Sequence, residues 1–455
     1  MNPPRVLILS HGHPDFSIGG GEIAAHAQWQ ELRRRGIETM LIARTSQSPR
    51  HAGAALSLRS ADGMEVLFSA PPVDHFRHSQ PNRRVIHDEF RALLERFRPT
   101  VVHFHHYVHL GLEMVREVRK FAPDGLIVMT LHEYLAICHA QGQMLKTNGL
   151  LCAKAAPLDC HACFPQITPQ DFFLRELFVK SFLHLVDRFV CPSIFLRDRY
   201  IEWGLPSDKM TVLENGQSAA PVTRAPGATP DGLRRRFVVL GQLSRLKGTL
   251  VVLEAVRLLP RRVRKLITIE IHGSMQYVVE DFRAQFESAL QEVKETVRHC
   301  GAYRPMDVHG IIQRSGWVIQ PSIWWENSPL VIQEAFAAGR PVICSNIGGM
   351  AEKVSHGVSG LQFRVGSASD LAAGIEEAAT TPGLWESLCS GLPRPPSIAS
   401  TVEDTLALYQ SVRVSSESIG EAEMEESLGA ALRKQRTAES ATKEIATMSV
   451  SAHAR

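Results

Sequence analysis

Two glutamates, Glu326 and Glu334, are the first residues whose type and spacing could do chemistry. They stand eight positions apart in the stretch ENSPLVIQEA, with Ser328 and Pro329 between them. Serine is a common N-cap and proline fits the first helical position, so the pair predicts a helix that begins at Pro329. Glu326 would lie in the loop before this helix and Glu334 inside it. The free N–H groups and the dipole of such a helix start favour a phosphate nearby.

Cysteines form the second chemical feature. Four of the eight fall in one segment with the spacing C-x13-C-x7-C-x2-C, and these are Cys138, Cys152, Cys160 and Cys163. A close Cys-x2-Cys pair with two outlying thiols suits a tetrahedral structural zinc, with His139 and His161 as spare ligands. An iron–sulfur cluster and unliganded thiols are the open alternatives.

Both features need elements that position them, and the chain supplies alternating apolar runs and amphipathic runs. Such alternation favours a parallel sheet covered by helices on both faces, which is an α/β fold. Helices are expected at 21–36 and 85–97. Strands are expected at 5–10, 38–43, 100–105, 126–132, 188–193, 266–273, 316–322 and 341–346, and the pattern restarts at 236–248.

The domain boundary is placed in a stretch rich in proline, alanine and glycine, which has no hydrophobic period. Each half then resembles its own doubly wound sheet. After about residue 415 the composition turns to Glu, Ser, Ala and Lys, which indicates a helical or disordered tail. The expected parts are a first domain over 1–217, a linker over 218–232, a second domain over 233–414 and a tail over 415–455.

Composition bounds the partners of the chain. Its 455 residues contain 50 lysine and arginine residues against 47 aspartate and glutamate residues, which is too balanced for a nucleic-acid binder. No signal peptide or membrane span is evident, so a cytoplasmic protein with reduced thiols is expected. Three basic runs, at 31–36, 233–237 and 260–265, are the only sign of peripheral contact with the inner face of a membrane, and solvated faces are the alternative.

The Glu-x7-Glu stretch, followed by AFAAGRPVICSNIGGMAE, is similar to the retaining glycosyltransferases of family 4. The motif order extends this resemblance over residues 5–412. The resemblance implies the GT-B fold, in which two Rossmann-like domains face each other across a cleft.

In the first domain the resemblance rests on two motifs. Gly20 and Gly21 in SIGGGE match a glycine loop that approaches the donor phosphate and the acceptor. His132 in TLHEY is similar to the histidine of a T-x-H-D motif, which faces the donor sugar. Glu133 replaces the aspartate of that motif, so the group that orients His132 is left open.

In the second domain LGQLSRLKG resembles a motif whose arginine and lysine hold the donor pyrophosphate. Lys247 matches the lysine, whereas Gln242 stands at the arginine position. Arg245 lies close in sequence and is a candidate to replace the missing cation. An ordinary surface lysine is the alternative interpretation of Lys247.

The resemblance also assigns the two glutamates. Glu326 is expected against the transferred sugar and Glu334 on the ribose hydroxyls of the nucleotide. Gly348 and Gly349 would let backbone come near the ligand, and Glu352 would be structural. Three more donor-binding positions follow from the match: Asn327, Ser328 and Leu330.

Together these matches imply an enzyme that moves a sugar from a nucleotide diphosphate-sugar to a glycan, lipid-linked or small-molecule acceptor. Retention of anomeric configuration without a catalytic metal is expected, and the cysteine array would shape the acceptor site. The alternatives are a catalytically weak or inactive glycosyltransferase-like binding subunit, or a sugar-nucleotide epimerase or phosphorylase on the same fold.

Overall fold

The structure of the chain is a computed structural model. It describes residues 3–17, 19–46, 54–69, 73–80, 83–217, 232–276 and 278–412. Nearly all of the predicted linker and the whole predicted tail lie outside these described residues. Met1–Asp404 form one compact unit, and Thr405–Arg455 form a second unit, of which residues 405–412 are helical.

The first half of the chain forms an eight-stranded sheet in the order β3-β4-β2-β1-β5-β6-β7-β8. All neighbouring strands are parallel except β3 and β4, which are antiparallel. The strands are β1 (Val6–Ser10), β2 (Thr39–Arg44), β3 (Leu56–Leu58), β4 (Glu65–Phe68), β5 (Val101–Phe104), β6 (Leu126–Thr130), β7 (Arg188–Cys191) and β8 (Met210–Val212). The helices are α1 (Gly20–Arg34), α2 (Arg83–Phe97), α3 (Glu113–Phe121), α4 (Pro157–Cys163), α5 (Pro169–Leu183) and α6 (Ile194–Trp203).

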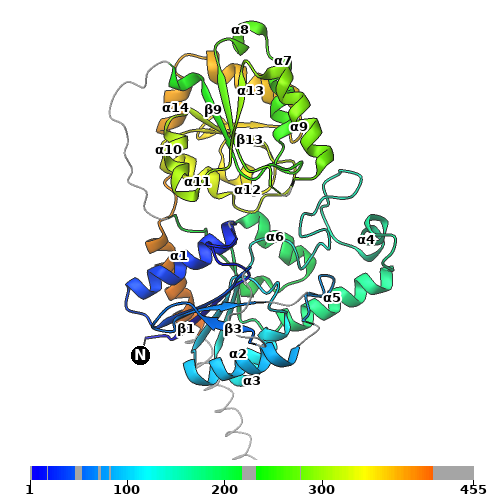
Figure 1. Cartoon of the computed structure of the whole chain (residues 1–455), viewed down its shortest axis with the longest axis vertical. Helices are drawn as coiled ribbons and strands as arrows, with labels where there is room; N and C mark the ends of the chain where they lie inside the picture. Colours follow the sequence, from blue (N-terminus) through cyan, green and yellow to red (C-terminus); the bar gives the residue numbers. More distant parts are fainter. Residues whose placement is uncertain are drawn as a thin grey trace, which may run out of the picture. The chain divides into compact units, whose positions relative to one another are not determined.

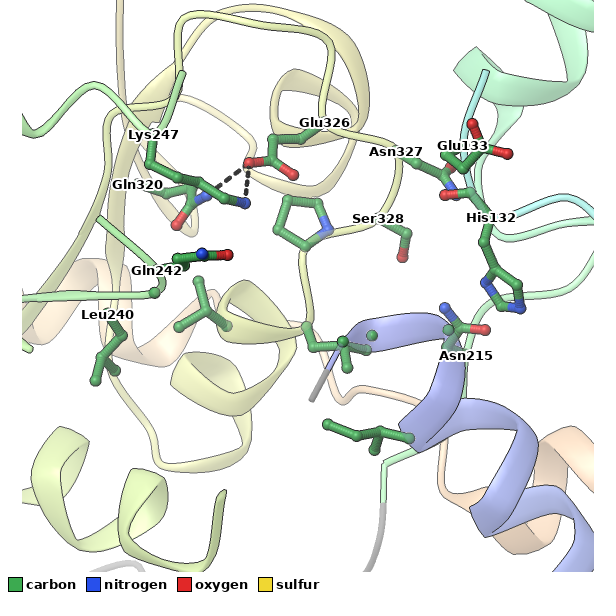
Figure 2. A pocket seen from close by; sticks show the side chains of 18 of the residues that line it. His132, Glu133, Asn215, Leu240, Gln242, Lys247, Gln320, Glu326, Asn327 and Ser328 are labelled. Atoms are coloured by element: carbon green, nitrogen blue, oxygen red, sulfur yellow. Dashed lines mark hydrogen bonds and ion pairs between the residues drawn. The ribbon is translucent and has the colours of Figure 1, made fainter. Parts of the chain in front are cut away.

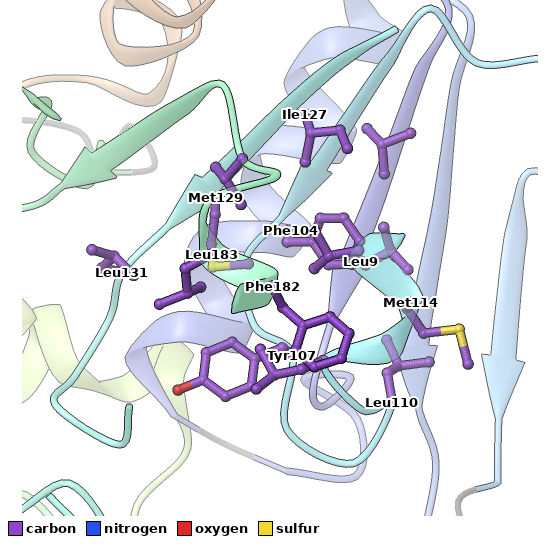
Figure 3. Packing of buried hydrophobic residues seen from close by; sticks show 14 of the residues in the cluster. Leu9, Phe104, Tyr107, Leu110, Met114, Ile127, Met129, Leu131, Phe182 and Leu183 are labelled. Atoms are coloured by element: carbon purple, nitrogen blue, oxygen red, sulfur yellow. The ribbon is translucent and has the colours of Figure 1, made fainter. Parts of the chain in front are cut away.

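Alternation along these strands builds the core of the first half. Successive side chains of a strand point to opposite faces, so Leu9, Phe104 and Met129 fall on one face of the sheet. They pack there with Met114 of α3 and Phe182 of α5 (Figure 3). The sheet is therefore fixed by apolar packing, and its strand ends are free to carry polar residues.

The second half forms a six-stranded parallel sheet in the order β11-β10-β9-β12-β13-β14. Its strands are β9 (Arg236–Leu240), β10 (Thr268–His272), β11 (Val297–Gly301), β12 (Trp317–Gln320), β13 (Val342–Ser345) and β14 (Gly360–Phe363). Its helices are α7 (Thr249–Leu258), α8 (Arg261–Arg264), α9 (Glu280–Val293), α10 (Val308–Gln313), α11 (Leu330–Ala337), α12 (Gly348–Lys353), α13 (Ala368–Thr380) and α14 (Leu384–Ser390).

Helices cover both faces of this second sheet. Phe237 and Ile319 pack in one apolar cluster with α7, α9, α13 and α14. Val238 and Val318, one residue along each strand, pack in another cluster with α10, α11 and α12 (Figure 1). A strand buried on both faces reads as a continuous apolar run, which is why the sequence predicted these strands as parallel.

In each sheet the order of the strands changes side at one strand, which is called a topological switch point. In the first sheet β1 lies between β2 and β5, and in the second β9 lies between β10 and β12. Ligands of open α/β sheets bind beyond the carboxyl ends of the strands at such switch points. The loops after β1, β5, β9 and β12 are therefore where a site is expected.

The predicted strands and helices agree closely with the observed elements, and five strands were not predicted: β3, β4, β8, β11 and β14. No helix in the described ranges has the length and apolar character needed to cross a membrane. The basic runs carry ion pairs to neighbouring carboxylates: Arg33–Asp62, Arg34–Glu31, Arg35–Glu31, Arg234–Glu386 and Arg262–Glu376.

Candidate active site

A cavity of about 410 Å³ lies at the strand ends and is lined by residues from both halves of the first unit. Cavities of this size suit a small-molecule ligand. Figure 2 shows Lys247, Gln320 and Glu326 on one side of it and His132 on the other. All predicted catalytic and donor-binding residues line this cavity: Gly20, Gly21, His132, Gln242, Lys247, Glu326, Asn327, Ser328, Leu330 and Glu334.

The carboxyl group of Glu326 is held by a set of donors. Its Oε1 accepts hydrogen bonds from Lys247 Nζ at 2.6 Å, Ser322 Oγ at 2.7 Å and Trp324 Nε1 at 3.0 Å. Gln320 Nε2 adds a fourth contact at 3.4 Å. The side chain of Glu326 is buried, so these donors fix its rotamer and compensate the cost of removing it from water.

Lys247 reaches Glu326 because the loops after β9 and β12 touch. Gly248 has a φ of 68°, and a Cβ built on it would lie 1.9 Å from the carbonyl oxygen of Pro321. Only glycine allows this approach. The amide of Ile323 also donates to the carbonyl of Leu246 at 2.9 Å. The Lys-Gly pair is therefore what places the ammonium group beside the carboxyl group.

The prediction that Ser328 caps the following helix is wrong. Helix α11 begins at Leu330, its N-cap is Pro329, and no side chain caps it. Ser328 Oγ is buried in the cavity wall with no hydrogen-bond partner among the described residues. A buried hydroxyl without a partner is costly in a protein interior, so this group fits a ligand rather than a helix cap.

Glu334 lies on α11 and is half-buried in the same cavity. Burial raises the pKa of its carboxyl group to about 7. Tyr303 lines the same cavity. Burial, and to a smaller extent the charge of Glu334, raise the pKa of the Tyr303 phenol to about 12. The carboxyl group thus changes its charge close to neutral pH.

On the opposite side of the cavity, His132 is hydrogen-bonded to a buried network of polar side chains. His132 Nε2 lies 3.1 Å from His105 Nδ1, and His105 Nε2 lies 3.1 Å from Gln28 Oε1. Gln28 Nε2 lies 3.1 Å from His103 Nδ1, whose Nε2 lies 2.7 Å from Thr130 Oγ1. The network joins α1, β5, β6 and the loops that follow these strands.

Charge and hydrogen bonding fix the protons in this network. Burial lowers the pKa of His132 and His105 well below the usual range and lowers the pKa of His103 to about 3, so all three rings are neutral at pH 7. Gln28 Oε1 can only accept, so His105 carries its proton on Nε2 and accepts at Nδ1. His132 must then donate from Nε2, which leaves its Nδ1 as an acceptor.

Glu133 does not orient His132. Its Oε1 lies 3.2 Å from His106 Nε2, and burial raises the pKa of Glu133 to about 8. The group that orients His132 is His105, one of a run of histidines at the end of β5. Glu133 still lines the cavity, beside His132 and Tyr134.

Asn327 joins the two halves of the site. Its Nδ2 donates to the carbonyl of His132 at 3.1 Å, and its Oδ1 accepts from Ser193 Oγ at 2.7 Å. Glu352 makes a second link, because its carboxylate accepts from the amides of Ile194 and Phe195, both at 2.9 Å. Acceptors at the first amides of a helix stabilise it, so Glu352 is structural in this sense.

Gly348 and Gly349 pack against the backbone of Glu326 and Asn327, two residues that line the cavity. A Cβ on Gly349 would lie 1.5 Å from the carbonyl oxygen of Asn327, and the Gly349 amide donates to the carbonyl of Glu326 at 2.8 Å. Arg245 is exposed, and its guanidinium pairs with Asp281 of α9 at 3.2 Å. Its role as a replacement for the missing cation stays a prediction.

The cysteine array closes around a cavity of its own of about 20 Å³. All four predicted thiols line it, together with His139 and apolar side chains that include Met144 and Phe164. None of the four is in a disulfide, and burial raises the pKa of Cys160 to about 11. The four thiols share this cavity without lying in metal-ligand contact. Two groups among the described residues have three ligand atoms all within 4.8 Å of one another, and neither includes a cysteine of the array: His13, His26 and Glu65; and Glu270, His272 and Cys300.

Two family models match the chain, one over each half. Residues 18–218 match the family model described as Glycosyltransferase Family 4, and residues 228–388 match the one described as Glycosyl transferases group 1. The chain is a glycosyltransferase of the GT-B type. The two matches in this order also agree with the two Rossmann-like sheets.

Two relatives of this glycosyltransferase have curated activities. The chain is 29% identical to the lipopolysaccharide 1,2-N-acetylglucosaminetransferase of Salmonella typhimurium over 276 residues. This match covers 58% of this chain and 60% of that protein. The chain is 24% identical over 400 residues to the glycogen synthase of Mycobacterium tuberculosis, which covers 83% and 86%. Among solved structures, HepE of Anabaena in complex with UDP is similar, with a TM-score of 0.61 and 14% identity over 90% of this chain and all of that one.

Sequence reasoning did not find several residues of the glycosyltransferase site. His105 and Gln28 were missed, although the run HFHH at 103–106 places three histidines where a buried strand ends. Trp324 and Ser322, which hold Glu326, carry no signal of their own. They could be recognised only once the loop after β12 was known to fold back on itself.

Proposed function

We propose that the chain transfers a sugar from a nucleotide diphosphate-sugar to a hydroxyl acceptor with retention of anomeric configuration. The single observation that carries the proposal is the Glu326–Lys247 pair, 2.6 Å apart, in a cavity whose other wall holds His132. A carboxyl group and an ammonium group side by side suit a substrate in which a sugar adjoins a pyrophosphate.

The nucleotide end of the donor is assigned to the second sheet. Glu334 is placed on the ribose, because a carboxylate accepts from both hydroxyls of a diol. Lys247 moves from Glu326 to the pyrophosphate, and the free hydroxyl of Ser328 donates to a phosphate or sugar oxygen. Gln242 supplies a neutral donor from the loop after β9. The complex of HepE with UDP favours a uridine nucleotide as the first donor to test.

The sugar end lies between Glu326 and His132. Glu326 favours the positive charge that develops at the anomeric carbon, and Nδ1 of His132 accepts a hydrogen bond from a sugar hydroxyl. The bond between the anomeric carbon and the phosphate oxygen breaks, and the acceptor oxygen bonds to the same face. The acceptor proton passes to the departing phosphate oxygen, so no protein nucleophile takes part. Lys247 stabilises the negative charge on that phosphate.

The acceptor is assigned by class. The relative that acts on lipopolysaccharide and the glycogen synthase both favour a carbohydrate acceptor, free or lipid-linked. Peripheral contact with an anionic membrane stays a prediction, and the ion pairs of Arg33, Arg34 and Arg35 argue against it for the first basic run. Cosedimentation with vesicles that contain anionic lipid tests this contact.

A second candidate is a binding subunit without turnover, and one observation favours it. Gln242 stands where a cation would otherwise stabilise the leaving group, and Arg245 pairs with Asp281 and is not among the residues that line the cavity. Lys247 alone would then offset the charge of the pyrophosphate. An epimerase or a phosphorylase on the same fold is the other alternative.

The deciding experiment offers the purified chain a panel of nucleotide diphosphate-sugars with carbohydrate acceptors and measures release of free nucleotide diphosphate. A transferase releases nucleotide only when an acceptor is present, and proton NMR of the product shows the donor's anomeric configuration. An epimerase converts donor without acceptor, a phosphorylase requires phosphate, and a binding subunit binds donor without turnover. An inverted product would contradict the proposed mechanism.

A further inference from the structure

The segment that carries three of the four clustered cysteines has no core of its own. Every residue from Leu145 to Asp171 is exposed or half-buried, and helix α4 within it contains no buried side chain. Leu150 and Leu158 are 64% and 75% exposed. Its apolar contacts are few: Cys152 and Ala155 pack against the core of the first half, and the ring of Phe164 packs against those of His139 and Phe172. So few contacts do not order a stretch of this length, so another interaction must hold it.

The thiols supply that interaction. Cys138 leads into the segment, Cys152 lies in its middle, and Cys160 and Cys163 lie one turn apart on α4. All four line one cavity of about 20 Å³, the size of a single small occupant.

The surroundings also suit an ion. Met144, Phe164 and Phe172 line the cavity with apolar atoms, which keep water away from a site. Lys146 lines it too, and its positive charge offsets part of the negative charge of four thiolates around a divalent ion.

The segment contacts the loop that carries Glu326. Trp325 Nε1 donates to the carbonyl of Cys152 at 3.1 Å, and its ring stacks on Phe195 with the centroids 4.9 Å apart. Arg199 donates to the carbonyl of Ala153 at 2.7 Å. The residue that precedes Glu326 is therefore positioned by the backbone at the second cysteine.

We propose that Cys138, Cys152, Cys160 and Cys163 bind one structural zinc ion, which orders residues 145–163 and, through the Cys152 carbonyl, positions Trp325 beside Glu326. Four thiolates around one ion match the tetrahedral preference of zinc, and such a closed site has no open position for chemistry. The proposal of a zinc site is argued from this segment alone and does not depend on the proposed function. The effect of the zinc site on catalysis rests on the proposed transferase function.

Metal content and proteolysis test the site without any assay of activity. Elemental analysis of the full chain, purified without chelator, is expected to find about one zinc per chain. The double variant Cys160→Ser/Cys163→Ser should lose it, whereas Cys389→Ser, a thiol outside the array, should keep it. Trypsin should cut after Lys146 and Lys154 in the double variant and leave the zinc-bound protein intact there.

Chelator treatment of the wild-type chain gives the same comparison if the double variant does not fold. Metal-free protein whose trypsin pattern is unchanged by added zinc would overturn the proposal. Iron with visible absorbance, or a mass that shows disulfides among the four cysteines, would overturn it as well.

The link to catalysis is tested separately with Trp325→Phe, which keeps a ring to stack on Phe195 and removes the N–H group. Its kcat is expected to be about fivefold lower, the factor that one net hydrogen bond supplies. Chelation should lower the wild-type kcat by a similar factor and affect the variant little, because both changes remove the same contact. Equal further losses in both proteins would overturn the positioning role and leave the zinc site standing.

Discussion

Glu326 and Glu334 are the same residue type in one cavity, yet their surroundings differ. Glu326 is held by Lys247, Ser322 and Trp324, and these contacts fix its position. Burial alone raises the pKa of the Glu334 carboxyl group to about 7. The surroundings therefore give the two carboxyl groups different properties, because Glu326 is fixed by hydrogen bonds and Glu334 has a pKa near neutral pH, as their proposed roles on sugar and nucleotide require.

Nucleotide binding should depend on pH through Glu334. Below pH 7 its carboxyl group is mostly protonated, and a ribose diol binds better to the carboxylate. Binding should thus lower this pKa and release a proton, so affinity for the nucleotide diphosphate rises with pH and levels off above about 7. Calorimetry in buffers of different ionisation enthalpy measures the proton release.

The phosphate of the ligand also titrates near this range, and Glu334→Gln is the control for it, because any pH dependence that survives in this variant belongs to the ligand. An identical pH profile in wild type and Glu334→Gln would refute the assignment of the titrating group.

Lys247→Ala should cost on the order of 2 to 4 kcal/mol of transition-state stabilisation, the value of one preorganised electrostatic group. The variant also leaves Glu326 without its nearest cation. Arg245→Ala is the matched control, since Arg245 pairs with Asp281 on the surface and should leave kcat/KM unchanged. The measurement is kcat/KM for the donor in both variants. A larger loss in Arg245→Ala would show that the phosphate cation is misassigned.

At the scale of elements, α1, β5 and β6 share one buried polar network behind the site. Gln28 comes from α1, His103 from β5 and Thr130 from β6, while His105 and His132 follow their strands. Neutral imidazoles each have one donor and one acceptor, so every proton in the chain of contacts depends on the amide of Gln28. Packing of three elements thereby selects one tautomer of His132.

His105→Phe should release that tautomer while keeping a ring in the core. We expect kcat to fall by about tenfold, the upper end of what one net hydrogen bond supplies, with donor binding retained. The readout specific to this role is the imidazole nitrogen spectrum of His132, which should change from one protonated Nε2 to a mixture of tautomers. His105→Asn, which can still accept from His132, should restore part of the activity. An unchanged His132 spectrum in His105→Phe would contradict the network.

At the scale of the whole molecule, apolar periodicity predicted the strands that are buried on both faces, because local pattern and burial agree there. It missed β3, β4, β8, β11 and β14. The cavity residues were found by motif. An error arose where the local conformation departs from the motif: Pro329 is extended and serves as the N-cap of α11, so Ser328 does not cap the helix. The packing of Gly349 on the carbonyl of Asn327 and the ion pair of Arg245 with Asp281 of α9 were not predicted either. Such contacts have no local signature.

The most direct test of the account compares Glu326→Ala and Glu334→Ala in steady-state transfer with a donor that the wild type uses. The account predicts that Glu326→Ala lowers kcat by about 100-fold or more with donor KM nearly unchanged, because it removes a group that acts in the transition state. Glu334→Ala should raise donor KM by about tenfold or more and change kcat little, because it removes hydrogen bonds to the nucleotide. Wild-type kinetics in both variants, or the opposite division between kcat and KM, would contradict the account.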